Sequence, residues 1–126
     1  MLIAMAPRFL IVDDSEAFLT ASRDTLERQG VAVAGVATSI AEGVQRAEEL
    51  DPDVVLVDID LGGESGFELT RQLADEGRAS RSDIILISAH PEDDFADLIE
   101  ASPALGFISK SDLSAGAIGK LLAASS

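Results

Sequence analysis

Cysteine, tryptophan and tyrosine are absent from this chain of 126 residues, and histidine occurs once, as His90. Without cysteine there are no disulfides, thiolate metal sites or cysteine nucleophiles, and one histidine cannot build a multi-histidine metal site. Basic residues are scarce: nine Lys and Arg stand against 23 Asp and Glu, which gives a formal net charge of −14. Such a charge repels phosphate backbones and anionic lipid. We therefore expect neither nucleic-acid binding by this domain nor a role at a membrane surface.

Long apolar runs are also absent, so no segment of the sequence is predicted to span a bilayer, and we expect a cytoplasmic protein. With 47% hydrophobic residues, the chain has enough apolar surface to bury a core without disulfides or a structural metal. The length allows one domain of ordinary size. We therefore expect a single domain over residues 1–126, with a core from about 8 to 124 and a loose leader over 1–7.

Five short apolar runs alternate with segments of helical periodicity. Most of the runs are β-branched and continuous rather than alternating, which is typical of strands buried on both faces of a parallel sheet. They cover residues 9–12, 31–36, 54–57, 84–87 and 105–108. The segments between them have the spacing of helices with one inward face, formed by Leu19, Ser22 and Leu26; Ile40, Val44, Ala47 and Leu50; Phe95, Leu98 and Ile99; and Ile118, Leu121 and Leu122. The order predicts a doubly wound α/β fold, a five-stranded parallel sheet with helices on both faces.

Residues that favour helix ends stand at the boundaries of these segments. Two serines have a glutamate three residues later, the spacing of a capping box, and a proline before an acidic run suits a first helical turn. Glycines stand where two helices should end. The predicted starts are Ser39 with Glu42, Ser65 with Glu68, and Pro91, and the predicted ends are Gly30 and Gly77.

Chemically active side chains follow four of the five predicted strands. Asp13 and Asp14 follow the first, Asp58 the third, Ser88 the fourth, and Lys110 lies just beyond the fifth. Because function in such sheets gathers at the carboxyl ends of the strands, we expect these residues to converge. Crowded carboxylates repel one another and need a cation, for which Mg²⁺ with its oxygen ligands is the natural candidate. A lysine and a hydroxyl then fit a bound phosphoryl group, and an aspartate beside Mg²⁺ can accept it as a nucleophile.

With these motifs at these separations, the chain resembles the receiver domain of bacterial two-component response regulators over roughly residues 8–124. The matching segments are residues 11–14, 52–61 with Gly66, 87–89 and 108–110. Residues 104–113 resemble the subgroup that usually carries a LuxR/NarL-type helix-turn-helix output domain, although we expect no output domain in this chain. The resemblance implies a flavodoxin-like or CheY-like (βα)5 fold with strand order 2-1-3-4-5.

The resemblance also implies a role for each site residue and a cytoplasmic signalling switch that catalyses only its own phosphorylation and dephosphorylation. The phosphoryl donor would be a sensor histidine kinase or a phosphotransfer protein, and a weak homodimer is compatible with the family. Asp58 would be the phosphoacceptor and a Mg²⁺ ligand; Asp14 would bind Mg²⁺ directly, Asp13 mostly through water and Asp60 through its backbone carbonyl; Lys110 and Ser88 would bind phosphoryl oxygens; and Phe107 would be the switching aromatic.

Two residues depart from the family pattern. Gly62 stands four residues after Asp58, where the family usually has proline, and we expect it to leave that loop more flexible. Ser111 follows Lys110, where many members have a proline and a cis peptide bond. Because a cis bond before a non-proline residue costs about 3 kcal/mol, we predict that the Lys110–Ser111 bond is trans.

The sequence also predicts how Phe18 packs. Phe18 and Leu19 are adjacent, so a helix cannot point both squarely inward. We expect ordinary packing at the edge of the core, with an exposed apolar anchor for a kinase helix as the alternative.

Phe107 has no hydroxyl and gains nothing polar by facing water. We therefore expect it to face inward before phosphorylation, which would weaken the coupling between the site and the outer surface.

Two other functions compete with the phosphorylated receiver. A pseudo-receiver would bind partners without phosphorylation, but such proteins commonly lack the acceptor, an acidic partner or the lysine. An aspartate-nucleophile phosphohydrolase is suggested by Asp58-Ile59-Asp60, which resembles the DxD motif of haloacid-dehalogenase-like enzymes. Those enzymes place DxD on the first strand and the acidic pair after it, whereas here Asp13 and Asp14 come first, so this alternative is the weaker one.

Overall fold

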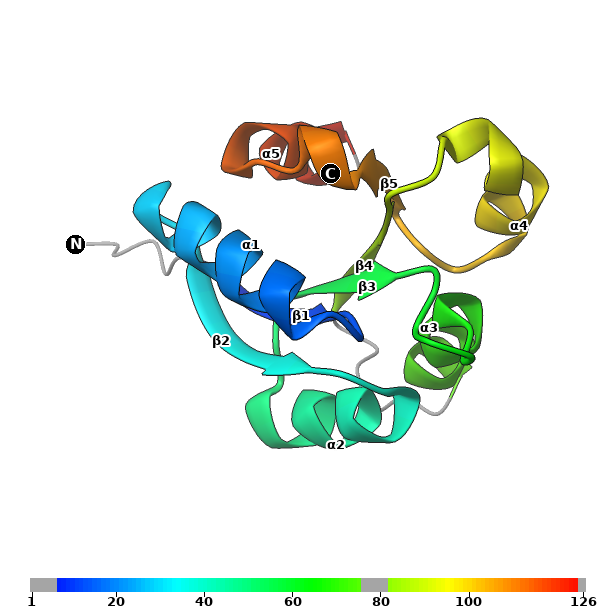
Figure 1. Ribbon diagram of the computed structural model, residues 1–126, viewed down its shortest axis with the longest axis horizontal. Helices are drawn as coiled ribbons and strands as arrows, with labels where there is room; N and C mark the ends of the chain where they lie inside the picture. The colour runs from blue at the N-terminus through cyan, green and yellow to red at the C-terminus, as the bar shows by residue number, and fades with distance from the viewer. Residues whose placement is uncertain (1–6, 76–81, 125–126) are drawn as a thin grey trace.

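The computed structural model describes residues 7–75 and 82–124 (Figure 1). Its strands are β1 (Arg8–Val12), β2 (Ala32–Ala37), β3 (Val54–Asp58), β4 (Asp83–Ser88) and β5 (Gly106–Ser109). Its helices are α1 (Glu16–Arg28), α2 (Ile40–Leu50), α3 (Gly66–Asp75), α4 (Ala96–Ala101) and α5 (Ala115–Ala124), with the 3-10 turns η1 (Glu92–Phe95) and η2 (Lys110–Asp112). The strands form one parallel sheet in the order β2-β1-β3-β4-β5. This confirms the predicted fold class and strand order.

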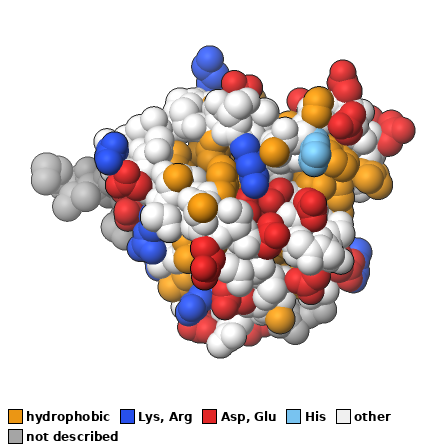
Figure 2. Space-filling model, viewed as in Figure 1, with side chains coloured by type: hydrophobic (Ala, Val, Ile, Leu, Met, Phe, Trp, Pro, Cys, Tyr) orange, Lys and Arg blue, Asp and Glu red, His pale blue; other side chains and the backbone are white. Residues whose placement is uncertain are grey.

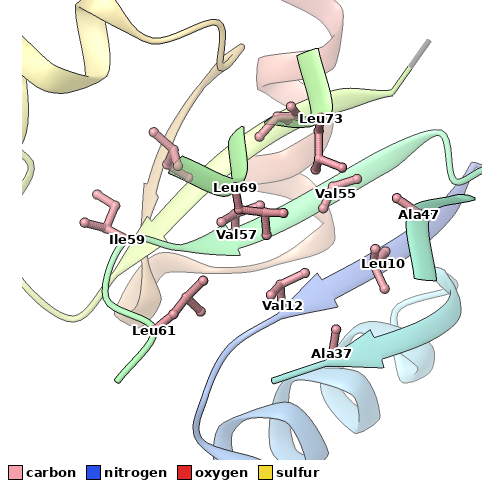
Figure 3. Packing of buried hydrophobic residues seen from close by; sticks show 12 residues of the cluster. Leu10, Val12, Ala37, Ala47, Val55, Val57, Ile59, Leu61, Leu69 and Leu73 are labelled. Atoms are coloured by element: carbon pink, nitrogen blue, oxygen red, sulfur yellow. The ribbon is translucent and has the colours of Figure 1, made fainter. Parts of the chain in front are cut away.

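Two hydrophobic layers hold the sheet between its helices. Neighbouring residues of β1 point to opposite faces, so Leu10 and Ile11 belong to different clusters. One cluster packs the sheet against α2 and α3 and includes Leu69 and Leu73 of α3 (Figure 3). The other joins the opposite face to α1 and α5 (Figure 1). Both faces of the central strands are therefore covered, which explains their continuous apolar sequences.

The position of each strand in the sheet sets how deeply it is buried. All five residues of β3 are buried, and β1 and β4 are buried except at their first residues. The edge strands β2 and β5 are only partly covered, because each has a neighbour on one side alone. The predicted strands agree with the observed ones to within one residue at each end.

The structure agrees with some of the predicted helix ends and not with others. The Ser39 hydroxyl accepts a hydrogen bond from the Glu42 N–H (3.2 Å), but the Glu42 carboxylate reaches the N–H of Thr38 (2.8 Å) rather than that of Ser39. Ser65 directly precedes α3, as predicted, and its hydroxyl accepts a hydrogen bond from the N–H of Phe67 (3.1 Å). The Glu68 half of this capping box was wrong, because its carboxylate pairs with Arg71 on the exposed helix face. Gly30 follows α1 with φ +89°, as predicted. The predicted helix end at Gly77, and residues 1–6 of the predicted leader, lie outside the described residues.

The fourth helix is shorter and begins differently from the prediction. Pro91 precedes the 3-10 turn η1, and only six residues follow as α4. Phe95 and Ile99 pack against the first hydrophobic cluster, but the side chain of Leu98 is 56% exposed. Its predicted place on the inward face was wrong, because a tight first turn changes the phase of the residues that follow. No helix within the described ranges is long and apolar enough to cross a membrane.

Candidate functional site

Three carboxylates meet at the carboxyl edge of the sheet, as the sequence predicted. Asp13 and Asp14 follow β1, and Asp58 is the last residue of the adjacent strand β3. One oxygen from each lies within 4.8 Å of the other two. Asp13 and Asp58 are buried whereas Asp14 is exposed, so the cluster is open to solvent on the side of Asp14. Asp and Glu side chains outnumber Lys and Arg on the face shown in Figure 2.

Backbone hydrogen bonds fix two of these carboxylates. The N–H of Asp13 donates to the carbonyl of Ala37 (3.0 Å), which extends the pairing of β1 with β2 by one residue. Asp13 Oδ1 then accepts a hydrogen bond from the N–H of Ser15 (2.8 Å), the residue that caps α1. Asp58 Oδ1 accepts one from the N–H of Asp60 (3.2 Å). Each carboxylate is thus held by the loop that leaves its own strand.

Lys110 joins the cluster from the far edge of the sheet. It follows β5 as the first residue of η2, and its Nζ lies 2.6 Å from Asp13 Oδ2 and 3.2 Å from Asp58 Oδ2. The same ammonium lies 4.2 Å from the centroid of the Phe18 ring. Leu19 is buried while Phe18 packs partly buried at the margin of the second cluster, so packing at the edge of the core is confirmed. The contact of Phe18 with Lys110 was not predicted; an aromatic residue in the first turn after an Asp pair was the available signal.

The crowding of charges changes how these groups ionise. Burial, and next the negative charge of Asp13, raise the pKa of Asp58 from 3.8 to about 6, although Lys110 acts in the opposite direction. Burial by itself would lower the pKa of Lys110, but its pairing with Asp13 and Asp58 outweighs burial and raises it. At neutral pH, Lys110 is therefore charged and Asp58 is an ionised carboxylate of raised basicity.

The donor set fits a hard divalent cation. Asp13 Oδ2 is buried and accepts no hydrogen bond among the described residues; the approach of Lys110 is an ion pair rather than an aligned hydrogen bond. A buried carboxylate oxygen that accepts no hydrogen bond is costly to keep ionised, and a further positive charge beside it would lower that cost. Mg²⁺ takes oxygen ligands and usually keeps several waters beside one or two carboxylates. Asp13, Asp14 and Asp58 offer such oxygens at the exposed side of the cluster, and they fit this ion.

The other predicted site residues lie around this centre. Ser88 ends β4 in a buried position, one residue past Ile87, which pairs with Asp58 across the sheet. Its hydroxyl accepts a hydrogen bond from the N–H of His90 (3.0 Å). Phe107 on β5 is partly buried, packs against the first hydrophobic cluster and lines a surface hollow of about 440 Å³.

The two departures from the family pattern take defined conformations. Asp60 is exposed, and its carboxylate accepts a hydrogen bond from the N–H of Gly62 (3.1 Å). The backbone N–H of Leu61 donates to the carbonyl of Glu64 (2.9 Å), so the segment around Gly62 is a hydrogen-bonded turn. No peptide bond among the described residues is cis, the Lys110–Ser111 bond included, which confirms the prediction of a trans bond there.

Comparison with known proteins identifies the family. Residues 9–117 match the family model described as the response regulator receiver domain. The chain belongs to this family. Receiver domains of this kind are signalling switches of two-component systems, they bind Mg²⁺ at an acidic cluster, and they interact with sensor histidine kinases.

Individual relatives agree with this assignment. The transcriptional regulatory protein LiaR of Bacillus subtilis is 34% identical over 119 residues, which cover 94% of this chain and 56% of LiaR. A two-component response regulator of the LuxR family from Aurantimonas is 26% identical with a TM-score of 0.79, covering 95% of this chain and 87% of that one. A response regulator from Burkholderia pseudomallei, whose structure has a phosphorylated aspartic acid, a calcium ion and citrate, is 26% identical with a TM-score of 0.76, covering 93% of this chain and 65% of that one.

These relatives confirm the predicted subgroup of LuxR/NarL-type response regulators. The chain spans about half the length of the curated relatives that it matches, 56% for LiaR and 48% for the response regulator GacA of Pseudomonas viridiflava.

Proposed function

We propose that this receiver domain accepts a phosphoryl group on Asp58 from a phosphohistidine of a sensor kinase or phosphotransfer protein, with Mg²⁺ bound by Asp13, Asp14 and Asp58. One observation carries the proposal: Lys110 Nζ lies 3.2 Å from the carboxylate of Asp58, inside a cluster of three carboxylates. The phosphorylated aspartic acid and the calcium ion in the Burkholderia pseudomallei relative support the same chemistry here.

Asp58 is the carboxylate best suited to act as the nucleophile. It is buried at a strand end, and its pKa of about 6 makes it a stronger base than an ordinary aspartate while leaving it mostly ionised at pH 7. Its carboxylate oxygen forms a bond to phosphorus while the bond from phosphorus to the histidine nitrogen breaks, and the histidine retains the electron pair of that bond.

The surrounding residues neutralise the charge of the transferred group. Lys110 is held charged beside Asp58 and donates to a phosphoryl oxygen in place of the Asp58 oxygen that it contacts now. When bound, Mg²⁺ supplies further positive charge next to the phosphoryl oxygens. Ser88 stands at the end of the neighbouring strand and donates its hydroxyl to another oxygen after leaving the N–H of His90.

The movement of Ser88 away from the N–H of His90 links the site to the surface of the domain. Its shift vacates space behind β4, and Phe107, on the adjacent strand β5, is the bulky side chain placed to fill it. The surface formed by α4, β5 and α5 is the face that this movement would reach, but because Phe107 already packs against the first hydrophobic cluster, we expect the change there to be small.

Intact-mass spectrometry after incubation with acetyl phosphate and Mg²⁺ tests the proposal. We expect one added phosphoryl group on the natural protein, none on Asp58→Ala, and none when EDTA removes the metal. Asp97→Ala, which alters an exposed carboxylate on α4 away from the site, is the control and should still be labelled. Labelling of the Asp58→Ala protein would contradict the assignment of the acceptor, and a natural protein that is never labelled would favour a pseudo-receiver.

A further inference from the structure

The turn between β3 and α3 bends back over the carboxyl edge of the sheet through two glycines. Gly62 has φ +65° and Gly63 has φ +100°, backbone conformations that L side chains rarely adopt. Backbone hydrogen bonds close the turn on both sides, from Leu61 N–H to the carbonyl of Glu64 and from Gly66 N–H to the carbonyl of Ile59. The path of the turn is thus fixed by its own hydrogen bonds.

The two glycines differ in what lies next to them. A Cβ atom on Gly62 would come within 2.7 Å of Asp14 Oδ2, a distance that forces one of the two groups to move. A Cβ atom on Gly63 would meet no atom within 4 Å. The strain of a positive φ is therefore common to both positions, whereas contact with the site belongs to Gly62 alone.

We propose that Gly62 is a positioning residue for the metal site: because it has no Cβ atom, the turn leaves free the space that the Asp14 carboxylate occupies beside Asp13 and Asp58. Asp14 is the exposed member of the cluster, so its carboxylate can swing away from Asp13 and Asp58 when a Cβ atom takes that space. Mg²⁺ tolerates little departure from octahedral geometry, and a displaced carboxylate binds it poorly. This inference rests on the proposed Mg²⁺ site.

The proposal explains why the proline usual at this place in the family would not suit this chain. Proline fixes φ near −65° and has no N–H, whereas Gly62 has φ +65° and donates its N–H to Asp60 Oδ1 (3.1 Å). A proline here would require a different path for the turn and remove the contact with Asp14. The family residue should therefore weaken the site of this chain.

Titration calorimetry with Mg²⁺ on Gly62→Ala and Gly63→Ala tests the proposal, with thermal unfolding in EDTA as the measure of strain. Both variants should lose similar stability, because both place alanine at a positive φ. Gly62→Ala should bind Mg²⁺ at least tenfold more weakly than the natural protein, the size of effect seen when the support of a metal ligand is removed. Gly63→Ala should stay within about twofold.

The side-chain carboxyl ¹³C resonance of Asp14 in the metal-free protein gives a second readout. It should shift in Gly62→Ala and not in Gly63→Ala. Should either alanine variant fail to fold, Gly62→Asn and Gly63→Asn replace the pair, because asparagine tolerates a positive φ and still carries the Cβ atom.

Equal Mg²⁺ affinities for the two variants, or a Gly62→Pro protein that binds Mg²⁺ more tightly than the natural one, would overturn the role of Gly62 and leave the proposed function intact. A natural protein that binds no Mg²⁺ would overturn both.

Discussion

The ammonium group of Lys110 lies over the ring of Phe18, 4.2 Å from its centroid, while contacting Asp13 at 2.6 Å and Asp58 at 3.2 Å. Phe18 belongs to the first turn of α1, and Lys110 follows β5. The ring therefore contacts the same ammonium group that pairs with the two carboxylates. A cation over an aromatic face gains roughly 0.5–2 kcal/mol, depending on how far both are desolvated.

Replacing Phe18 with leucine should slow phosphorylation while keeping the fold. Leucine retains an apolar side chain at the edge of the core but removes the attraction of the ring for the ammonium. A loss of about 1 kcal/mol in the positioning of Lys110 corresponds to a roughly fivefold slower rate, measured by mass spectrometry over time with acetyl phosphate. Phe67→Leu is the matched control, because Phe67 is also partly buried but lies on α3 and contacts Phe95. Equal rates for the two variants would contradict a role for the Phe18 ring.

Asp58→Asn should stabilise the metal-free protein, and the gain should depend on pH. Because burial and Asp13 raise the pKa of Asp58 to about 6 in the folded state, against 3.8 ordinarily, ionisation of this group opposes folding. The folded protein binds more protons than the unfolded chain between these two values, so stability falls as pH rises from about 4 to 6. Above pH 6 the full penalty is present, and the asparagine variant should be more stable by about 1–3 kcal/mol.

Urea unfolding in EDTA at pH 4, 5, 6 and 8 measures this gain, which should be largest at pH 8 and nearly absent at pH 4. Asp60→Asn, at an exposed position, should differ from the natural protein by less than about 0.5 kcal/mol throughout. A gain that is the same at every pH, or a loss at pH 8, would show that ionised Asp58 does not oppose folding.

Beryllofluoride, a mimic of the phosphoryl group, should change the site more than the outer surface. Phe107 carries no hydroxyl and already packs against the first hydrophobic cluster, so it has little to gain by moving. We expect amide shifts confined to the loops around Asp14, Asp58 and Lys110 in spectra recorded with and without the mimic. Large shifts through residues 95–101 and at Phe107 would instead reveal a full switch that reaches α4 and β5.

The sequence by itself determined the sheet and the edge at which the site lies. Continuous β-branched runs at β1, β3 and β4 predict buried parallel strands because both faces of such strands are covered, and parallel strands place their carboxyl ends together. The positions of Asp13 and Asp58 directly after or at the end of neighbouring strands were therefore sufficient to predict that their carboxylates meet.

Tertiary structure decided the features that depend on packing around these elements. Leu98 is exposed because a 3-10 turn precedes α4 and changes the phase of the helix, which apolar spacing does not reveal. Phe18 meets Lys110 although the two stand near opposite ends of the chain. The approach of Gly62 to Asp14 likewise joins the loops that follow two different strands, so it depends on the pairing of β1 with β3 rather than on either local sequence.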